Sequence, residues 1–219
     1  MKKLAAVCAL TLAVPAMGDI VTNGGFELGT GSDADNWNQL AIFGGDQGAF
    51  AAADRIGPGF GGPSGAYEGD SYMSLSVSGA PDYGPVAEIQ QQTLVGSIVG
   101  GQEYDFSFAG QGYAGPGTVA FYEVLWFDGD GSNGGGPQGS ATGLQTWSLG
   151  TEWALNGMAG LIAPDGADSV LIQIRLVTGA FSEAEGNAAI DAVSMIAIPA
   201  PGALALFGLA GIANRRRRG

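Results

Sequence analysis

The sequence predicts an all-β protein, a jelly-roll β-sandwich flanked by a sorting segment at each end. Three observations carry this prediction. Short apolar runs recur along residues 19–196, with turn residues between them. The chain contains 40 glycines, many of them in these intervening stretches. No long segment has the apolar periodicity of a helix.

Nine segments have the length and alternation of strands. Residues 118–127 (TVAFYEVLWF) are the most apolar, so we expect them near the centre of a sheet. Eight or nine antiparallel strands in one domain indicate two stacked sheets, as in a jelly roll. The expected strands are 19–26, 71–78, 88–95, 102–109, 118–127, 144–149, 153–161, 169–177 and 188–196.

The composition excludes several kinds of catalytic group and ligand. The chain has no histidine, its only cysteine is Cys8, and its only lysines are Lys2 and Lys3. Residues 19–197 therefore lack histidine-based triads, thiol chemistry and Schiff-base lysines. The same residues hold two basic side chains against 21 acidic ones, a net charge of −19. We expect such a surface to repel nucleic acid and anionic lipid.

The first 18 residues are typical of a secretory signal peptide. Lys2 and Lys3 precede the apolar run 4–14, and Ala16-Met17-Gly18 supplies small residues for signal peptidase. We expect cleavage before Asp19, which leaves residues 19–197 as the β-sandwich domain. A buried N-terminal helix is the alternative reading of this run.

The C-terminal segment, 198–219, has three parts. Pro199-Ala200-Pro201 is followed by the apolar run 203–213 and by an arginine cluster. This order resembles the PEP-CTERM sorting signal of Gram-negative bacteria, with Ala200 in place of the usual glutamate. The resemblance implies a transient inner-membrane stage and cleavage by an exosortase; a plain membrane anchor is the alternative. The sorting residues are Pro199, Ala200, Pro201, Arg215, Arg216, Arg217 and Arg218.

The order of motifs in the domain carries a second resemblance. The segments 21–27 (VTNGGFE), 69–75 (GDSYMSL), 101–104 (GQEY) and 190–194 (IDAVS) occur in sequence. Together they resemble the jelly-roll carbohydrate-binding modules of secreted glycanases. The resemblance implies a structural calcium ion bound by carboxylates from both ends of the domain. The matching residues are Glu27, Glu68, Asp70 and Asp191; surface or turn carboxylates are the alternative reading.

Sugar binding requires exposed aromatic side chains with polar neighbours. Trp126 and Trp147 lie within apolar runs and are expected in the core. Five aromatic residues in or near expected loops are the candidate glycan contacts: Trp37, Tyr67, Tyr83, Tyr113 and Trp153. Packing alone is the alternative role for each of them.

Two acidic patterns have simpler interpretations. Residues 128–133 (DGDGSN) resemble the start of a calcium loop, but position 139 is glycine, so a hairpin turn is expected. Glu183 and Glu185 are candidate paired carboxylates of a glycosidase, but their Gly- and Ala-rich loop favours solvent exposure.

The sequence thus predicts a non-catalytic protein of the bacterial surface or extracellular matrix. Extracellular polysaccharide is its expected ligand, calcium its expected cofactor, and signal peptidase and exosortase its partners during export. Two alternatives stay open. One is a carboxylate-dependent glycan hydrolase or lyase, and the other is a structural or adhesive domain with no glycan ligand.

Overall fold

The computed structural model of the chain describes residues 18–43, 45, 48–58, 65–130 and 135–199. The expected signal peptide up to residue 17 and the sorting residues beyond Pro199 lie outside these ranges. Within the described ranges, no helix has the length and hydropathy needed to cross a membrane.

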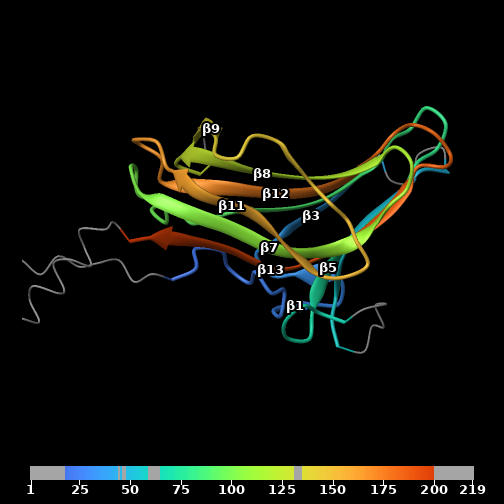
Figure 1. Ribbon diagram of the computed structural model, residues 1–219, viewed down its shortest axis with the longest axis horizontal. Coiled ribbons are helices and arrows are strands. Elements are labelled where there is room, and N and C mark those ends of the chain that lie inside the picture. The colour runs from blue at the N-terminus through green and yellow to red at the C-terminus, as the bar shows by residue number, and fades with distance from the viewer. Residues whose placement is uncertain (1–17, 44, 46–47, 59–64, 131–134, 200–219) are drawn as a thin grey trace, which may run out of the picture.

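The described chain is almost entirely β-structure, arranged in two stacked sheets (Figure 1). One sheet has the order β11-β7-β13-β5-β4, and the other has the order β10-β8-β12-β6-β3, with β9 paired to β8. A small pair, β1 and β2, lies beside them. The strands are β1 (Gly29–Thr30), β2 (Asp33–Ala34), β3 (Asn38–Ile42), β4 (Phe50–Ile56), β5 (Tyr72–Ser78), β6 (Val86–Gln92), β7 (Glu103–Ala114), β8 (Thr118–Asp128), β9 (Gly136–Ser140), β10 (Gln145–Trp147), β11 (Ala154–Ile162), β12 (Ser169–Thr178) and β13 (Glu185–Ile198).

Alternation along the strands builds the core between the two sheets. On β12, Val170, Ile172 and Ile174 are fully buried in the core, whereas Leu171 and Gln173 between them point to the outer face of the sheet. From the facing sheet, Phe106 and Phe108 of β7 pack within 6 Å of the Tyr122 ring. The core is therefore made where two apolar faces meet, as the jelly-roll prediction required. The all-β sandwich is confirmed.

Trp126 and Trp147 are core residues, as expected. Trp147 packs edge-on against Phe108 at 5.2 Å between ring centroids. Its ring also fills the space over Gly110, where an added Cβ would lie 2.4 Å from the indole. Glycine at position 110 thus makes room for the tryptophan.

The expected strand over 19–26 is wrong. Only Asp19 is bridged to a strand, by pairing with Ile196. The segment turns instead because Asn23 and Phe26 adopt positive φ angles of 54° and 55°. The Asn23 side chain fixes that turn by donating to the carbonyls of Leu28 and Asp35 and by accepting from the Leu28 amide.

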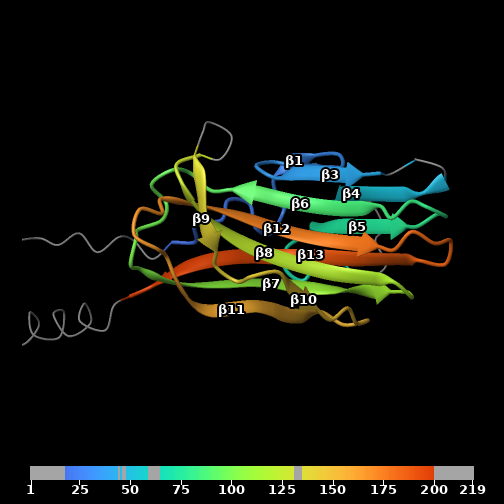
Figure 2. The ribbon, with the colours of Figure 1, turned by 90° about the horizontal axis from the view of Figure 1, so that it is seen from above.

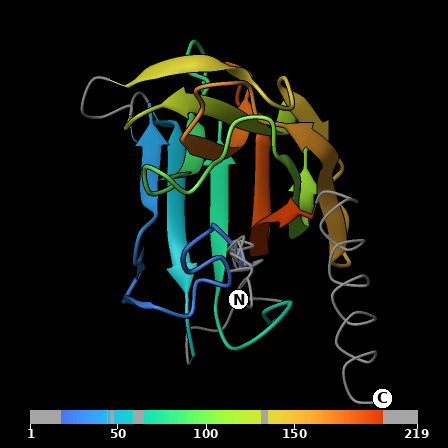
Figure 3. The same cartoon turned by 90° about the vertical axis from the view of Figure 1, so that its left-hand side faces the viewer.

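Five strands escaped the sequence prediction: the two-residue strands β1 and β2, and the longer strands β3, β4 and β9. Both β3 and β4 are edge strands, paired on one side only to β6 and β5. β4 has few large apolar residues (FAAADRI), and β9 is rich in glycine (GPQGS). β9 pairs antiparallel with the end of β8 (Figure 3). The hairpin turn expected over residues 128–133 lies partly outside the described residues.

The first and last described residues lie at one end of the sandwich, because Asp19 pairs with Ile196 (Figures 1 and 2). The connections 93–102 and 163–168 lie at the same end, since Gly101 donates to the Ala163 carbonyl.

Candidate functional site

A row of polar side chains crosses the outer face of the six-stranded sheet. The register pairs Asn38 with Gln90, Gln90 with Gln173, and Gln173 with Glu123. These four residues therefore lie side by side on β3, β6, β12 and β8. They face away from the core, because the next residue on β12, Ile174, is fully buried.

Hydrogen bonds to neighbours on the same face of the sheet fix this row. The Gln173 side-chain amide donates to Glu88 Oε1 at 3.0 Å and to Gln90 Oε1 at 3.1 Å. Glu88 is only 3% exposed although it lies on an outer face. Its charge is balanced by Arg175, whose Nε lies 3.0 Å from Glu88 Oε2. The network therefore holds both glutamine side chains in one orientation.

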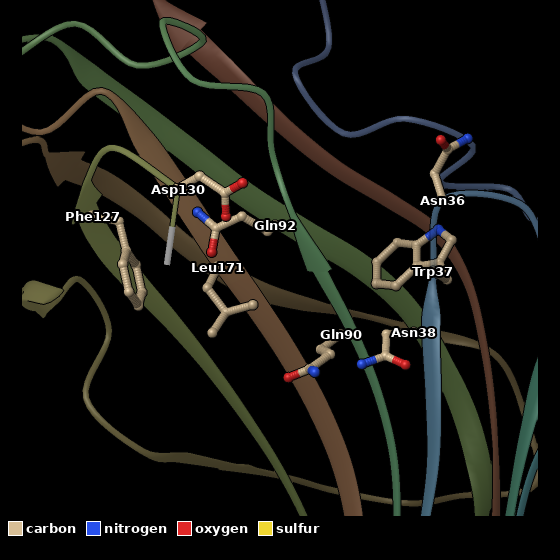
Figure 4. A pocket seen from close by; sticks show the side chains of 8 residues that line it. All are labelled: Asn36, Trp37, Asn38, Gln90, Gln92, Phe127, Asp130 and Leu171. Carbon is tan, nitrogen blue, oxygen red and sulfur yellow. The ribbon is translucent and has the colours of Figure 1, made fainter. Parts of the chain in front are cut away.

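The row borders a hollow of about 580 Å³. Phe127 and Trp37 lie on opposite sides of this hollow, with Gln90, Gln92 and Leu171 between them (Figure 4). We call it the amide groove. Its lining residues are Asn36, Trp37, Asn38, Gln90, Gln92, Phe127, Asp130 and Leu171.

Backbone contacts position the rims of the amide groove. Gln91, which points inward from β6, donates to the Asn36 carbonyl at 3.2 Å and holds that rim against the sheet. On the other side, Gln92 donates to Ser169 Oγ at 2.8 Å, and Ser169 donates to the Gly129 carbonyl. The groove is therefore largely pre-formed, which reduces the entropy lost on binding.

The chemistry of the groove suits an uncharged polar ligand. Amide side chains both donate and accept hydrogen bonds, as hydroxyl groups do. Phe127 and Leu171 add apolar surface for the carbon face of such a ligand. Glu88, Glu123 and Asp130 outnumber Arg175 in and around the groove, so an anionic ligand would be repelled.

The five aromatic residues that were predicted to contact a glycan do not lie together in the structure. Trp37 is only 7% exposed; its Nε1 donates to the Asn23 carbonyl and its ring packs on Phe26. It therefore lines the amide groove with one edge and is not the exposed loop aromatic that we expected. Tyr83 lies in the turn after β5, bridged to Ala80, and does not line the amide groove.

The other three predicted aromatics lie in or beside the five-stranded sheet: Tyr113 is in β7, whereas Tyr67 and Trp153 are in loops. Trp153 packs against Tyr67 at 5.9 Å and edge-on against Tyr72 at 6.1 Å between ring centroids. Tyr113, at the end of β7, is 51% exposed. None of the three lines the amide groove.

Three of the four predicted calcium ligands surround Gly25. A Cβ built on Gly25 would lie 3.5 Å from Glu68 Oε1, 3.8 Å from Asp191 Oδ1 and 3.9 Å from Glu27 Cγ. Asp70 takes part through its backbone amide, which donates to Glu27 Oε1 at 2.8 Å. In the described part of the chain, no three acidic side chains are arranged closely enough to hold one metal ion.

The carboxylates instead bind backbone amides. Asp191 Oδ2 accepts from Tyr67 at 2.8 Å and from Glu68 at 3.0 Å, while Oδ1 accepts from Ala192. Glu27 Oε1 accepts from Asp70 and Ser71. The segment before β5 is thus tied to both ends of the domain. We call these contacts the carboxylate staple.

Burial raises the pKa of Asp191 to about 6, because water is excluded from a carboxyl group that is fully buried. The hydrogen bonds from the amides of 67, 68 and 192 oppose this rise, and the negative charge of Glu68 adds to it. The staple therefore contains an acid that titrates near neutral pH.

The glutamines of the groove were missed, although the sequence contains a signal for them. On β12, the inward positions 170, 172, 174 and 176 are all apolar, whereas Gln173 and Arg175 interrupt the run between them. A central strand with polar residues on its outward positions has an outer face exposed to solvent or ligand. Which partner strands complete the row depends on register, which the sequence does not reveal.

Comparison with known proteins shows the fold. No family model matches the chain, and no curated protein is similar to it. Solved structures are similar, and they include carbohydrate-binding modules with the jelly-roll β-sandwich fold. TmCBM61, solved with β-1,4-galactotriose, has a TM-score of 0.52 and 17% identity, covering 83% of this chain and 99% of that one.

Two enzymes have a similar fold. The enzymatically active domain of tailspike protein 4 of bacteriophage CBA120 has a TM-score of 0.57 and 17% identity. The match covers 82% of this chain and only 21% of that one. The Stig cyclase FisC of Fischerella sp. TAU has a TM-score of 0.55 and 13% identity, covering 84% and 100%. These identities establish the shared sandwich and nothing about activity.

Proposed function

We propose that this protein is a non-catalytic module that binds a neutral extracellular polysaccharide in the amide groove. The observation that carries the proposal is the set of three amide side chains that line the groove, Asn38, Gln90 and Gln92. Gln173 donates to Gln90, and Gln92 donates to Ser169, so two of the three are held in place. Amide donors and acceptors match sugar hydroxyls, and the hollow is large enough for several atoms of a bound chain.

Further support comes from the carboxylates near the groove. Glu88 is engaged by Arg175 and Gln173 and is covered by its neighbours, so it has no free path to a bound sugar. Glu183 and Glu185, the candidate catalytic pair, are both exposed at the opposite end of the sandwich from the termini. Binding without hydrolysis is therefore the function proposed here.

Affinity electrophoresis tests the proposal. The full-length protein is run in gels that contain β-1,4-galactan, xylan or hydroxyethyl cellulose, with polygalacturonate as the anionic comparison. We expect retardation by at least one neutral polymer and none by polygalacturonate. Equal retardation by the anionic polymer, or none by any neutral one, would contradict the proposal.

Export and sorting form a second part of the proposal. The support is the sequence of residues 1–18 and 198–219, which suits signal peptidase, exosortase and a final place at the cell surface or in the extracellular matrix. Mass spectrometry of the protein recovered from an exosortase-containing bacterium should give an N-terminus at Asp19 and a C-terminus near Pro199. Intact ends on the surface-located protein would refute this part.

Calcium binding at the carboxylate staple is also proposed. Hard oxygen ligands are what Ca²⁺ requires, and Glu68 Oε1 and Asp191 Oδ1 both lie within 4 Å of the Cβ position of Gly25, with Glu27 beside them. Because no three described acidic side chains are close enough to hold an ion as they stand, binding would draw these carboxylates together. Burial is the main cause of the raised pKa of Asp191, and the like charge of Glu68 adds to it. A bound cation would relieve that repulsion and would join the same segments as the amide contacts do.

A further inference from the structure

A second hollow, of about 420 Å³, lies on the outer face of the five-stranded sheet. Two rows of residues make its floor. Ser76 pairs with Asn187, and Asn187 pairs with Tyr113; one step along, Ser74 pairs with Ala189. We call it the tyrosine groove. Its lining residues are Tyr72, Ser74, Ser76, Gln111, Gly112, Tyr113, Gly150, Thr151, Asn187, Ala188 and Ala189.

The floor of this groove is low and polar. Serine and alanine side chains are short, so the floor lies below the tyrosines at its two sides, Tyr72 and Tyr113. Within the described ranges, the side chains of Ser74, Ser76 and Asn187 make no hydrogen bond to other protein groups. Their hydroxyl and amide groups are therefore available to a ligand.

Aromatic rings border the groove. Tyr113 is 51% exposed and stands at the end of β7. At the other end, Tyr72 joins the cluster with Trp153 and Tyr67, which is 44% exposed. The loop that carries Trp153 is held over β7 by the hydrogen bond from the Gly112 amide to the Gly150 carbonyl, at 2.7 Å. Rings beside free hydroxyl and amide groups are suited to sugars.

The two grooves open on opposite sides of the molecule. The amide groove lies on the sheet of β8, β12 and β6, and the tyrosine groove lies on the sheet of β7, β13 and β5. These sheets form the two layers of the sandwich, with the core between them (Figure 1). A ligand in one groove therefore does not block the other.

We propose that the tyrosine groove is a second, independent site for neutral polysaccharide, so that one molecule links two polysaccharide chains. The linking role rests on the proposed function of the amide groove, whereas the second site itself rests on the tyrosine groove alone. A protein with two sites on opposite faces increases the avidity for a polymer and joins separate polymer chains into a network.

Three variants of the full-length protein separate the two sites. Tyr113→Ala with Ser76→Arg removes a ring from the tyrosine groove and blocks its floor, at two positions that do not face the core. Gln90→Ala with Gln92→Ala disables the amide groove. Phe43→Ala, which changes an aromatic residue of similar exposure outside both grooves, is the matched control.

Retardation in the galactan, xylan and hydroxyethyl cellulose gels is measured together with the turbidity of protein–polymer mixtures. We expect each double variant to weaken retardation by about tenfold in apparent Kd, because avidity is lost, and to abolish turbidity. The control should behave like the wild type. Circular dichroism confirms that each variant is folded.

The possible failures are distinguishable. If the tyrosine-groove variant keeps full retardation and turbidity, the second site is refuted and the amide groove stands. If only the tyrosine-groove variant loses binding, the amide groove is refuted and this site stands alone. If the wild type is retarded by none of the three polymers, both sites are refuted.

Discussion

Gln173 donates a hydrogen bond to Glu88, 3.0 Å away, across the pairing of β12 with β6. The same amide group also donates to Gln90, and Glu88 in turn is paired with Arg175. A buried charge thereby orients the uncharged side chains beside it.

Removing the glutamines of the amide groove should weaken polysaccharide binding and leave the fold intact. Gln90→Ala with Gln92→Ala removes one acceptor for Gln173 and one donor to Ser169, which costs about 1–2 kcal/mol of stability. We expect about a tenfold loss of affinity in gel retardation. Gln145→Ala, another half-buried strand glutamine with one hydrogen bond to a backbone carbonyl, is the matched control and should bind normally.

Breaking the ion pair between Glu88 and Arg175, beside the groove, should destabilise the domain. Glu88→Ala leaves Gln173 and Arg175 without their shared acceptor, and we expect a loss of about 2 kcal/mol in urea unfolding. Glu88→Gln retains an acceptor oxygen and should cost less. An equal free energy of unfolding for the wild type and Glu88→Ala would show that this hydrogen-bond network does not stabilise the domain.

Glu27 should stabilise the domain although its side chain is exposed. Glu27→Ala removes the acceptor for the amides of Asp70 and Ser71, and a loss of about 1 kcal/mol is expected. Glu183→Ala removes an equally exposed carboxylate that accepts no hydrogen bond within the described residues. Chemical denaturation should leave that control unchanged.

Asp191 should make stability depend on pH. Its pKa in the folded protein is raised to about 6, above the value of an unfolded aspartate, so the folded state binds the proton more tightly. Its contribution to stability is therefore largest at low pH and is lost as pH rises through 6. In a chelator, lowering the pH from 7 to 5 should add about 1 kcal/mol through this group. Asp191→Asn should lack that increment, and an unchanged pH profile in this variant would contradict the assignment.

Calcium should raise the melting temperature if it binds the staple. A ligand that binds only the folded state stabilises it in proportion to the logarithm of its concentration. We expect millimolar Ca²⁺ to raise the Tm relative to a chelator, and Glu68→Gln to reduce that increase. Identical melting curves with Ca²⁺ and with chelator would exclude this site.

Much of the fold was predictable from alternation along single strands. The inward residues of β5 and β12 were identified because burial imposes a period of two on each strand. The turn at Asn23 was not, because a strand-like run there is overridden by hydrogen bonds from one side chain to distant carbonyls. The edge strands β3 and β4 were missed because pairing on one side demands little apolar surface.

The candidate site was less predictable for a related reason. Aromatic residues were expected to mark it, yet Trp37 is buried and the exposed rings of Tyr67 and Tyr113 lie outside the amide groove. The amide groove is formed by residues from four strands, brought into one row by register. Register depends on the packing of the whole sandwich, so no local pattern identifies the row.

Isothermal titration of the full-length protein with a neutral polysaccharide that retards it in gels tests the central claim most directly. The account predicts heat of binding for the wild type and for Gln145→Ala, and an affinity about tenfold lower for Gln90→Ala with Gln92→Ala. Unchanged affinity in that folded double variant would contradict the assignment of the amide groove as a polysaccharide site.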